Sequence, residues 1–108
     1  MNTLFFTSEE INLNPRASWG ELLQIVFINK EQYFSISKLA YEEELYFEYN
    51  EQTHYIYALC QDVEFNLKTN ALYIHITKTL KNNCSFSTIT IQLPSTPINL
   101  EEVLQHLK

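Results

Sequence analysis

The fold is decided by residues 45–59, which read LYFEYNEQTHYIYAL. Two runs with a period of two flank a polar connection at 50–53, and this period is typical of strands that bury one face. The segment therefore predicts a β-hairpin. The face expected to turn to the core carries Leu45, Phe47, Tyr49, His54, Ile56 and Ala58. The face expected to turn outward carries Tyr46, Glu48, Asn50, Tyr55, Tyr57 and Leu59.

A concentrated negative charge surrounds this hairpin. Residues 39–67 contain no Lys or Arg and seven acidic residues, so they carry a charge of −7. They also hold five of the seven tyrosines of the chain. Because the whole chain carries −6, the rest of it sums to about +1. The acidity is thus a property of one segment.

Alternating apolar and polar residues extend to both sides of the hairpin. The pattern predicts short strands at 4–6 and 11–13, hairpins at 22–37 and 63–77, and a last strand at 88–93. Residues 78–85 form a polar, basic-leaning segment and are predicted to be a loop. The stretch 19–28 has a second interpretation, because Ser18 and Glu21 have the spacing of a capping box that begins a helix. Its β-branched and aromatic residues favour a strand, which we adopt.

The period changes near the C-terminus. Asn99 and Glu102 have the spacing of a helix N-cap and its capping-box partner. An apolar stripe at helical spacing follows, formed by Leu100, Val103, Leu104 and Leu107. We therefore predict a single domain, residues 1–108, of the mainly β (α+β) class. It should be an antiparallel meander sheet, as a sandwich or a half-open barrel, with one short C-terminal helix.

Composition excludes several functional classes. Gly20 is the single glycine, so the clustered glycines of phosphate-binding loops and dinucleotide folds are missing, and no cofactor is expected. The first residues lack the basic head of a signal peptide, and no apolar run approaches the roughly 20 residues of a membrane span. We expect a cytoplasmic protein that does not enter membranes. In a reducing compartment, Cys60 and Cys84 should be free thiols rather than a disulfide.

The sequence contains no catalytic or metal-binding signature. There is no C-x-x-C pair and no D-x-D-x-D-G loop, and adjacent glutamates do not flank a cleft as a carboxylate pair would. A nucleophile pair between Cys60 or Cys84 and a histidine is the catalytic alternative. Nucleic acid is disfavoured because phosphates would be repelled and Arg16 is the sole arginine. We expect a protein that is not an enzyme and holds no metal.

The acidic, tyrosine-rich segment is the candidate binding site. Tyrosine offers large contact area at low entropic cost, and an uncompensated negative field attracts a basic partner. The other interpretation is a solvated face in which the tyrosines only pack against neighbouring strands. The predicted partner-binding residues are Glu42, Glu43, Glu44, Tyr46, Glu48, Tyr49, Glu51, Tyr55 and Tyr57.

In size, acidity, β-rich character and lack of catalytic residues, the chain resembles the immunity proteins that protect bacteria from polymorphic or contact-dependent toxins. The resemblance covers overall character and rests on no motif, so it assigns no residue by position. It implies a non-catalytic inhibitor of a toxin domain, such as a nuclease with a basic cleft. The alternatives are an adaptor or subunit of a larger assembly, and a small-ligand-binding β-barrel. The oligomeric state and the partner's identity are not encoded in these patterns.

Overall fold

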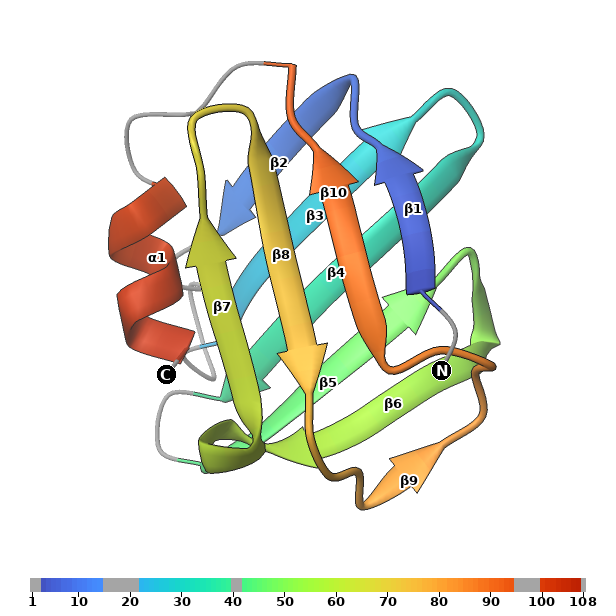
Figure 1. Ribbon diagram of the computed structural model, residues 1–108, viewed down its shortest axis with the longest axis vertical. Coiled ribbons are helices and arrows are strands. Elements are labelled where there is room, and N and C mark those ends of the chain that lie inside the picture. Colours follow the sequence, from blue (N-terminus) through green and yellow to red (C-terminus); the bar gives the residue numbers. More distant parts are fainter. Residues whose placement is uncertain (1–2, 15–21, 40–41, 95–99, 108) are drawn as a thin grey trace.

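The computed structural model describes residues 3–14, 22–39, 42–94 and 100–107. Two sheets face each other and enclose one core (Figure 1). The four-stranded sheet has the order β1-β10-β8-β7, and the six-stranded sheet has the order β2-β3-β4-β5-β6-β9. The elements are β1 (Thr3–Thr7), β2 (Glu10–Asn14), β3 (Leu22–Asn29), β4 (Gln32–Leu39), β5 (Glu44–Tyr49), β6 (Glu51–Leu59), the 3-10 turn η1 (Cys60–Asp62), β7 (Val63–Leu67), β8 (Ala71–Ile76), β9 (Lys81–Asn82), β10 (Thr88–Gln92) and α1 (Leu100–Leu107).

This architecture confirms the predicted fold class. Neighbouring strands are antiparallel except for β1 and β10, which are parallel. Residues 22–29 form a strand, so the helical interpretation of that stretch is wrong for its described part. The capping-box residues Ser18 and Glu21, and the N-cap residue Asn99, lie outside the described residues.

The core lies between the sheets, where the alternating apolar residues of both sheets meet. Phe27, Phe34 and Ile36 are fully buried, and burying a side chain of this size stabilises the fold by about 1.5–3 kcal/mol. The apolar stripe of α1 joins the same core, and the helix contacts β3 at the side of the sandwich next to β7 (Figure 1). The helix thereby covers apolar groups that the two sheets leave uncovered at that side.

Two residues in left-handed backbone conformation shape the turns. Lys30 has φ 52° in the β3–β4 turn, and Asn50 has φ 61° between β5 and β6. Asn50 also links three strands, because its Oδ1 accepts a hydrogen bond from the Tyr33 N–H at 2.8 Å and its N–H donates to the Tyr33 carbonyl at 3.0 Å. An asparagine therefore adopts the left-handed conformation of this turn, for which glycine would be the usual residue.

Two features depart from the sequence predictions. The predicted loop 78–85 contains the short strand β9, which pairs with β6. His54, predicted on the core face, is exposed, because it lies beyond the register shift at Glu48 and Tyr49 and beside a surface hollow. No helix in the described ranges is long and apolar enough to cross a membrane.

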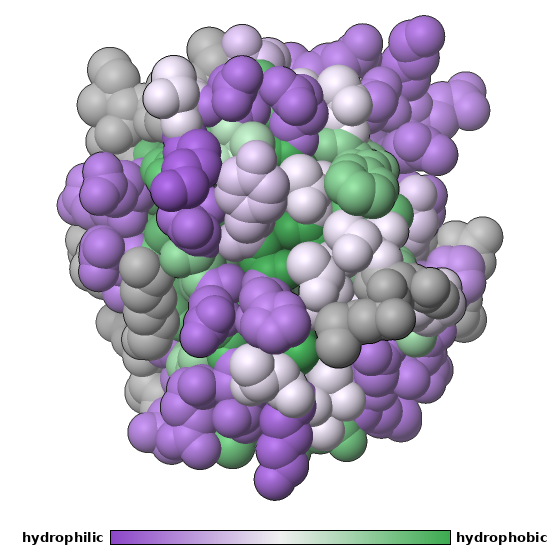
Figure 2. Space-filling view, viewed as in Figure 1, coloured by the Kyte–Doolittle hydropathy of each residue, from purple (hydrophilic) through white to green (hydrophobic). Residues whose placement is uncertain are grey.

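The outer faces of the two sheets differ in character. On the four-stranded sheet, Thr90 lies in register between Phe5 and Tyr73, whose side chains are 77% and 43% exposed. Figure 2 shows this side of the molecule, where hydrophilic and intermediate side chains surround smaller hydrophobic areas. The acidic hairpin β5–β6 belongs to the other sheet, and its outward face lies on the opposite side of the sandwich.

Candidate functional site

The outward face of β4, β5 and β6 carries a group of tyrosines around one carboxylate. Tyr46 on β5 is opposite Tyr57 on β6, and Glu48 is opposite Tyr55. The neighbouring β4 places Ser37 beside Tyr46 in the same sheet. We call Tyr33, Tyr46, Glu48, Tyr55 and Tyr57 the tyrosine–glutamate patch.

Ring contacts hold three of these tyrosines together. The Tyr46 ring lies 4.9 Å from the Tyr57 ring and 6.1 Å from the Tyr55 ring, between centroids. The Tyr55 and Tyr57 rings are 5.6 Å apart in an edge-to-face arrangement. Such contacts each contribute about 0.5–1.5 kcal/mol beyond the area that they bury. The rings are therefore fixed before any partner arrives, while Tyr57 remains 36% exposed.

Glu48 fixes the hydroxyl ends of the patch. The Tyr46 hydroxyl donates to Glu48 Oε1 at 2.6 Å, and the Tyr33 hydroxyl donates to the other carboxylate oxygen. Burial, together with this hydrogen bond to a negative acceptor, raises the pKa of Tyr46 well above its usual value. Tyr46 therefore stays a protonated donor further into the alkaline range than an ordinary tyrosine, and Glu48 is oriented by two phenols.

A cation from a neighbouring strand lies on the patch. Lys81 of β9 is in register with Tyr57, and its Nζ lies 5.3 Å from the centre of the Tyr55 ring. A hydrogen bond to Tyr55 raises the pKa of this lysine. The arrangement is a cation–π contact. Sequence reasoning missed Lys81 because it assigned residues 78–85 to a loop, although the basic character of that segment was visible.

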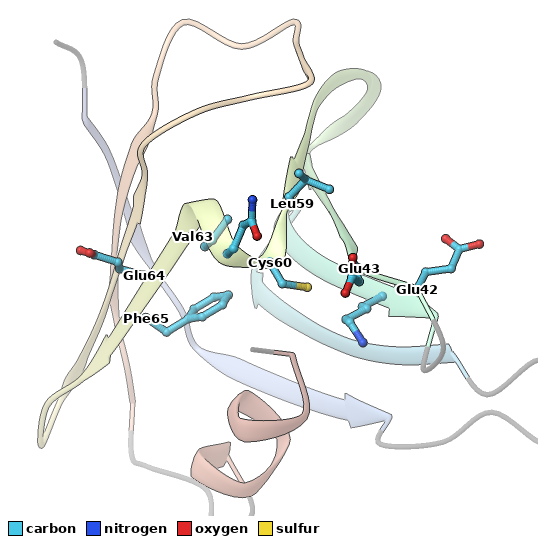
Figure 3. A pocket seen from close by; sticks show the side chains of 9 residues that line it. Glu42, Glu43, Leu59, Cys60, Val63, Glu64 and Phe65 are labelled. Carbon is cyan, nitrogen blue, oxygen red and sulfur yellow. The ribbon is translucent and has the colours of Figure 1, made fainter.

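The acidic run Glu42–Glu44 leads from the β4–β5 connection into the first residue of β5, and all three side chains are exposed. Figure 3 shows the Glu43 side chain pointing toward Cys60, whereas Glu42 points away from it. Glu42 and Glu44 border a hollow of about 340 Å³ on the outer face, next to Ser37, Tyr46 and Tyr57. The three glutamates of the run therefore do not all lie on the same surface.

A larger cavity of about 620 Å³ lies between the ends of the two sheets. Cys60, Val63 and Phe65 give it an apolar wall (Figure 3). Burial, reinforced by the charge of Glu43, raises the pKa of the Cys60 thiol, and the ammonium group of Lys38 opposes this change. The cavity thus combines apolar walls with Lys38 and with three glutamates, Glu42, Glu43 and Glu64.

The predicted site residues do not form one surface. The structure brings Tyr46, Glu48, Tyr55 and Tyr57 together, and it places Glu42 and Glu44 beside them. Tyr49 lies on the inward side of β5, where its ring packs edge-to-face against Phe6 and Phe86. Glu51 begins β6, and its side chain lies outside the described residues. Tyr33 belongs to the patch although sequence reasoning left it out.

The cysteines are free and lie at opposite ends of the β5–β6 hairpin. Cys84 and His54 border the same hollow of about 300 Å³, so this is the cysteine to compare with the nucleophile pair that the sequence left open. Burial raises the pKa of the Cys84 thiol, which is the opposite of what an activated cysteine requires. Within the described ranges, no group of three or more His, Cys, Asp or Glu side chains is placed to hold a metal ion.

Comparison of the chain with protein-family models, with curated proteins and with solved structures finds no match.

Proposed function

We propose that the chain is a non-catalytic inhibitor that binds a basic protein through the tyrosine–glutamate patch and the neighbouring Glu42 and Glu44. The observation that carries the proposal is the fixed ring cluster of Tyr46, Tyr55 and Tyr57 on an outward sheet face. Partly exposed tyrosines at the centre of a patch are typical binding hot spots. Their rotamers are already restricted, so association loses less side-chain entropy.

The charge of the surface indicates the partner's chemistry. Glu42 and Glu44 are exposed at the rim, where charges mainly raise the association rate of an oppositely charged protein. Glu48 lies among the rings and would meet the partner with its orientation already set by Tyr33 and Tyr46. In its specific form, which the resemblance to immunity proteins suggests, the partner is a toxin domain with a basic active cleft.

A capture experiment tests this proposal. The chain is immobilised and exposed to a lysate of the cells that produce it, at low and at moderate salt. We expect one basic protein to be retained at low salt and released as salt rises, because rim charges are screened within about 8–10 Å. The captured protein is identified, and its enzymatic activity is measured with increasing amounts of the chain. Loss of that activity at a one-to-one ratio supports an inhibitor.

Matched variants locate the site. Tyr55→Ser/Tyr57→Ser should abolish capture, whereas Tyr73→Ser removes an exposed tyrosine from the opposite sheet and should leave capture intact. Equal capture by the wild type, the Tyr55→Ser/Tyr57→Ser variant and the Tyr73→Ser variant would show that the patch is a solvated face. Capture of a partner whose activity is unchanged would favour an adaptor instead of an inhibitor.

The cavity between the sheets supports a second candidate function, the binding of a small ligand. Its volume of about 620 Å³ and its partly apolar lining fall within the usual range of ligand sites. Cys60→Phe would fill this cavity from its wall. If a small ligand found by a thermal-shift screen no longer binds to that variant while protein capture persists, the two functions are separate.

A further inference from the structure

The hollow of about 340 Å³ on the outer face lies where the patch meets the acidic run. Its floor is the small side chain of Ser37, which is buried and accepts a hydrogen bond from Gln24 Nε2 at 3.2 Å. Tyr46 and Tyr57 form aromatic walls, and Glu42 and Glu44 bring two carboxylates to the rim. A short residue between long ones therefore produces a depression that is large enough to admit a long side chain.

The lining of this hollow fits one chemical group. Aromatic faces attract cations, and planar guanidinium stacks on tyrosine while it forms paired hydrogen bonds with carboxylates. Lys38 is buried and borders both this hollow and the cavity between the sheets, as Glu42 does, so one positive charge lies close to the two rim carboxylates. The two carboxylates outnumber this single ammonium group, so the lining keeps a net negative charge toward a ligand on the outer face.

The structure contains a precedent for a cation on this cluster. Lys81 already lies over the ring of Tyr55, on the β9 side of the patch. Tyr46 and Tyr57 belong to the same ring cluster and border the hollow. This contact shows that a positive group can reach the face of Tyr55, which packs against the two rings that border the hollow.

We propose that this hollow is a socket for an arginine side chain of the basic partner. The inference rests on the proposed function, since it names the anchoring residue type at the same surface. Arginine is favoured over lysine because the walls are planar rings and the rim presents two carboxylates, which suit a flat, forked donor.

The socket is tested without the partner, by titrating the ¹⁵N-labelled chain with N-acetyl-arginine amide and recording amide shifts by NMR. We expect saturable shifts at Leu39, Glu44, Tyr46 and Tyr57. N-acetyl-citrulline amide has nearly the same shape as the arginine probe but no charge. Its binding should be weaker than that of the arginine probe by a factor of about five or more. The affinity of the corresponding lysine probe, N-acetyl-lysine amide, should lie between those of the arginine and citrulline probes.

Charge-matched variants control for a general loss of negative charge. Glu42→Gln/Glu44→Gln should weaken the arginine probe about fivefold. Glu9→Gln/Glu10→Gln changes the same charge on exposed residues at another part of the sheet and should leave binding unchanged. A well-dispersed spectrum of each variant shows that it is folded. Equal binding of the citrulline probe, shifts away from the socket, or equal effects of both variants would overturn the proposal.

A second experiment adds each probe to the immobilised chain with its captured partner. If the arginine probe releases the captured protein and the citrulline probe does not, the occupant is the partner's side chain. If the probe fills the socket while the protein stays bound, the assignment to the partner is overturned and the socket belongs to a free guanidinium compound. If no protein is captured, the proposed function fails, whereas the NMR titration still decides whether the hollow binds guanidinium.

Discussion

The substitution Tyr46→Phe tests the organisation of the patch, because it removes one oxygen and keeps the ring. The lost interaction is the hydrogen bond that the hydroxyl donates to Glu48 at 2.6 Å. Hydrogen bonds to charged groups contribute about 1.5–3 kcal/mol, and neutral ones about 0.5–1.5 kcal/mol. Both side chains are only half-buried, so solvent competes and we expect a loss of about 1 kcal/mol.

A double-mutant cycle isolates this interaction. The free energy of unfolding is measured in urea for the wild type, Tyr46→Phe, Glu48→Ala and the double variant. Glu48→Ala also removes the bond from Tyr33, but that loss occurs in both arms of the cycle and cancels. We expect a coupling energy of about 1 kcal/mol between Tyr46 and Glu48.

Tyr73→Phe is the matched control, since Tyr73 is 43% exposed on the other sheet. It should change stability by less than about 0.5 kcal/mol. A coupling energy below about 0.3 kcal/mol, the usual error of additivity, would refute the argument that Glu48 organises the tyrosines.

Further predictions concern pH, packing, the turn and the thiol. Because the folded-state pKa of Tyr46 is raised, its contribution is complete below the unfolded tyrosine pKa of about 10 and is lost as pH rises further. Urea midpoints should therefore fall more steeply above about pH 10 in the wild type than in Tyr46→Phe. Phe47→Ala empties a site that is 1% exposed and should cost about 3–5 kcal/mol in urea, whereas Phe5→Ala, 77% exposed, should cost under about 0.5 kcal/mol. Asn50→Ala should lower the free energy of unfolding by about 1–3 kcal/mol, because φ is 61° at this position and the Tyr33 N–H loses its acceptor. Asn50→Gly should recover part of that loss, because glycine adopts a positive φ without strain. Equal unfolding midpoints of the two variants would contradict this. Cys60 should react with iodoacetamide more slowly in the folded protein than in urea, because burial raises its pKa, and equal rates would show an accessible thiolate.

The faces of the strands could be predicted because alternation is a local property. Leu45, Phe47, Ile56 and Ala58 are all buried, as the period of two indicated, and Tyr57 is exposed. The helical stripe from Leu100 to Leu107 is buried for the same reason. In each case one residue and its near neighbours decide the orientation, so a single sequence contains the information.

The pairing of distant strands could not be predicted in this way. The parallel pair β1–β10 joins Phe6 to Ile91, and nothing in either short apolar run specifies the other. Lys81 reaches Tyr55 because a two-residue strand pairs with β6, a contact too short to leave a periodic pattern. Long-range pairing depends on the packing of the whole sandwich, which a local pattern does not describe.

For the acidic segment, the sequence gives the total charge but not how the fold distributes that charge over the surface. Its charge of −7 is contiguous in sequence, but the fold distributes it. Glu42 and Glu44 border the outer hollow, Glu43 points toward Cys60, and Glu64 lies on the other sheet, opposite His75 (Figure 3). The field on the patch is therefore weaker than the segment's charge suggests, and Lys81 weakens it further. In the proposed function, recognition of the partner would then depend more on the fixed tyrosine rings than on bulk charge. High salt should slow association more than it speeds dissociation, because rim charges act mainly on the approach of the partner and buried ring contacts on its release.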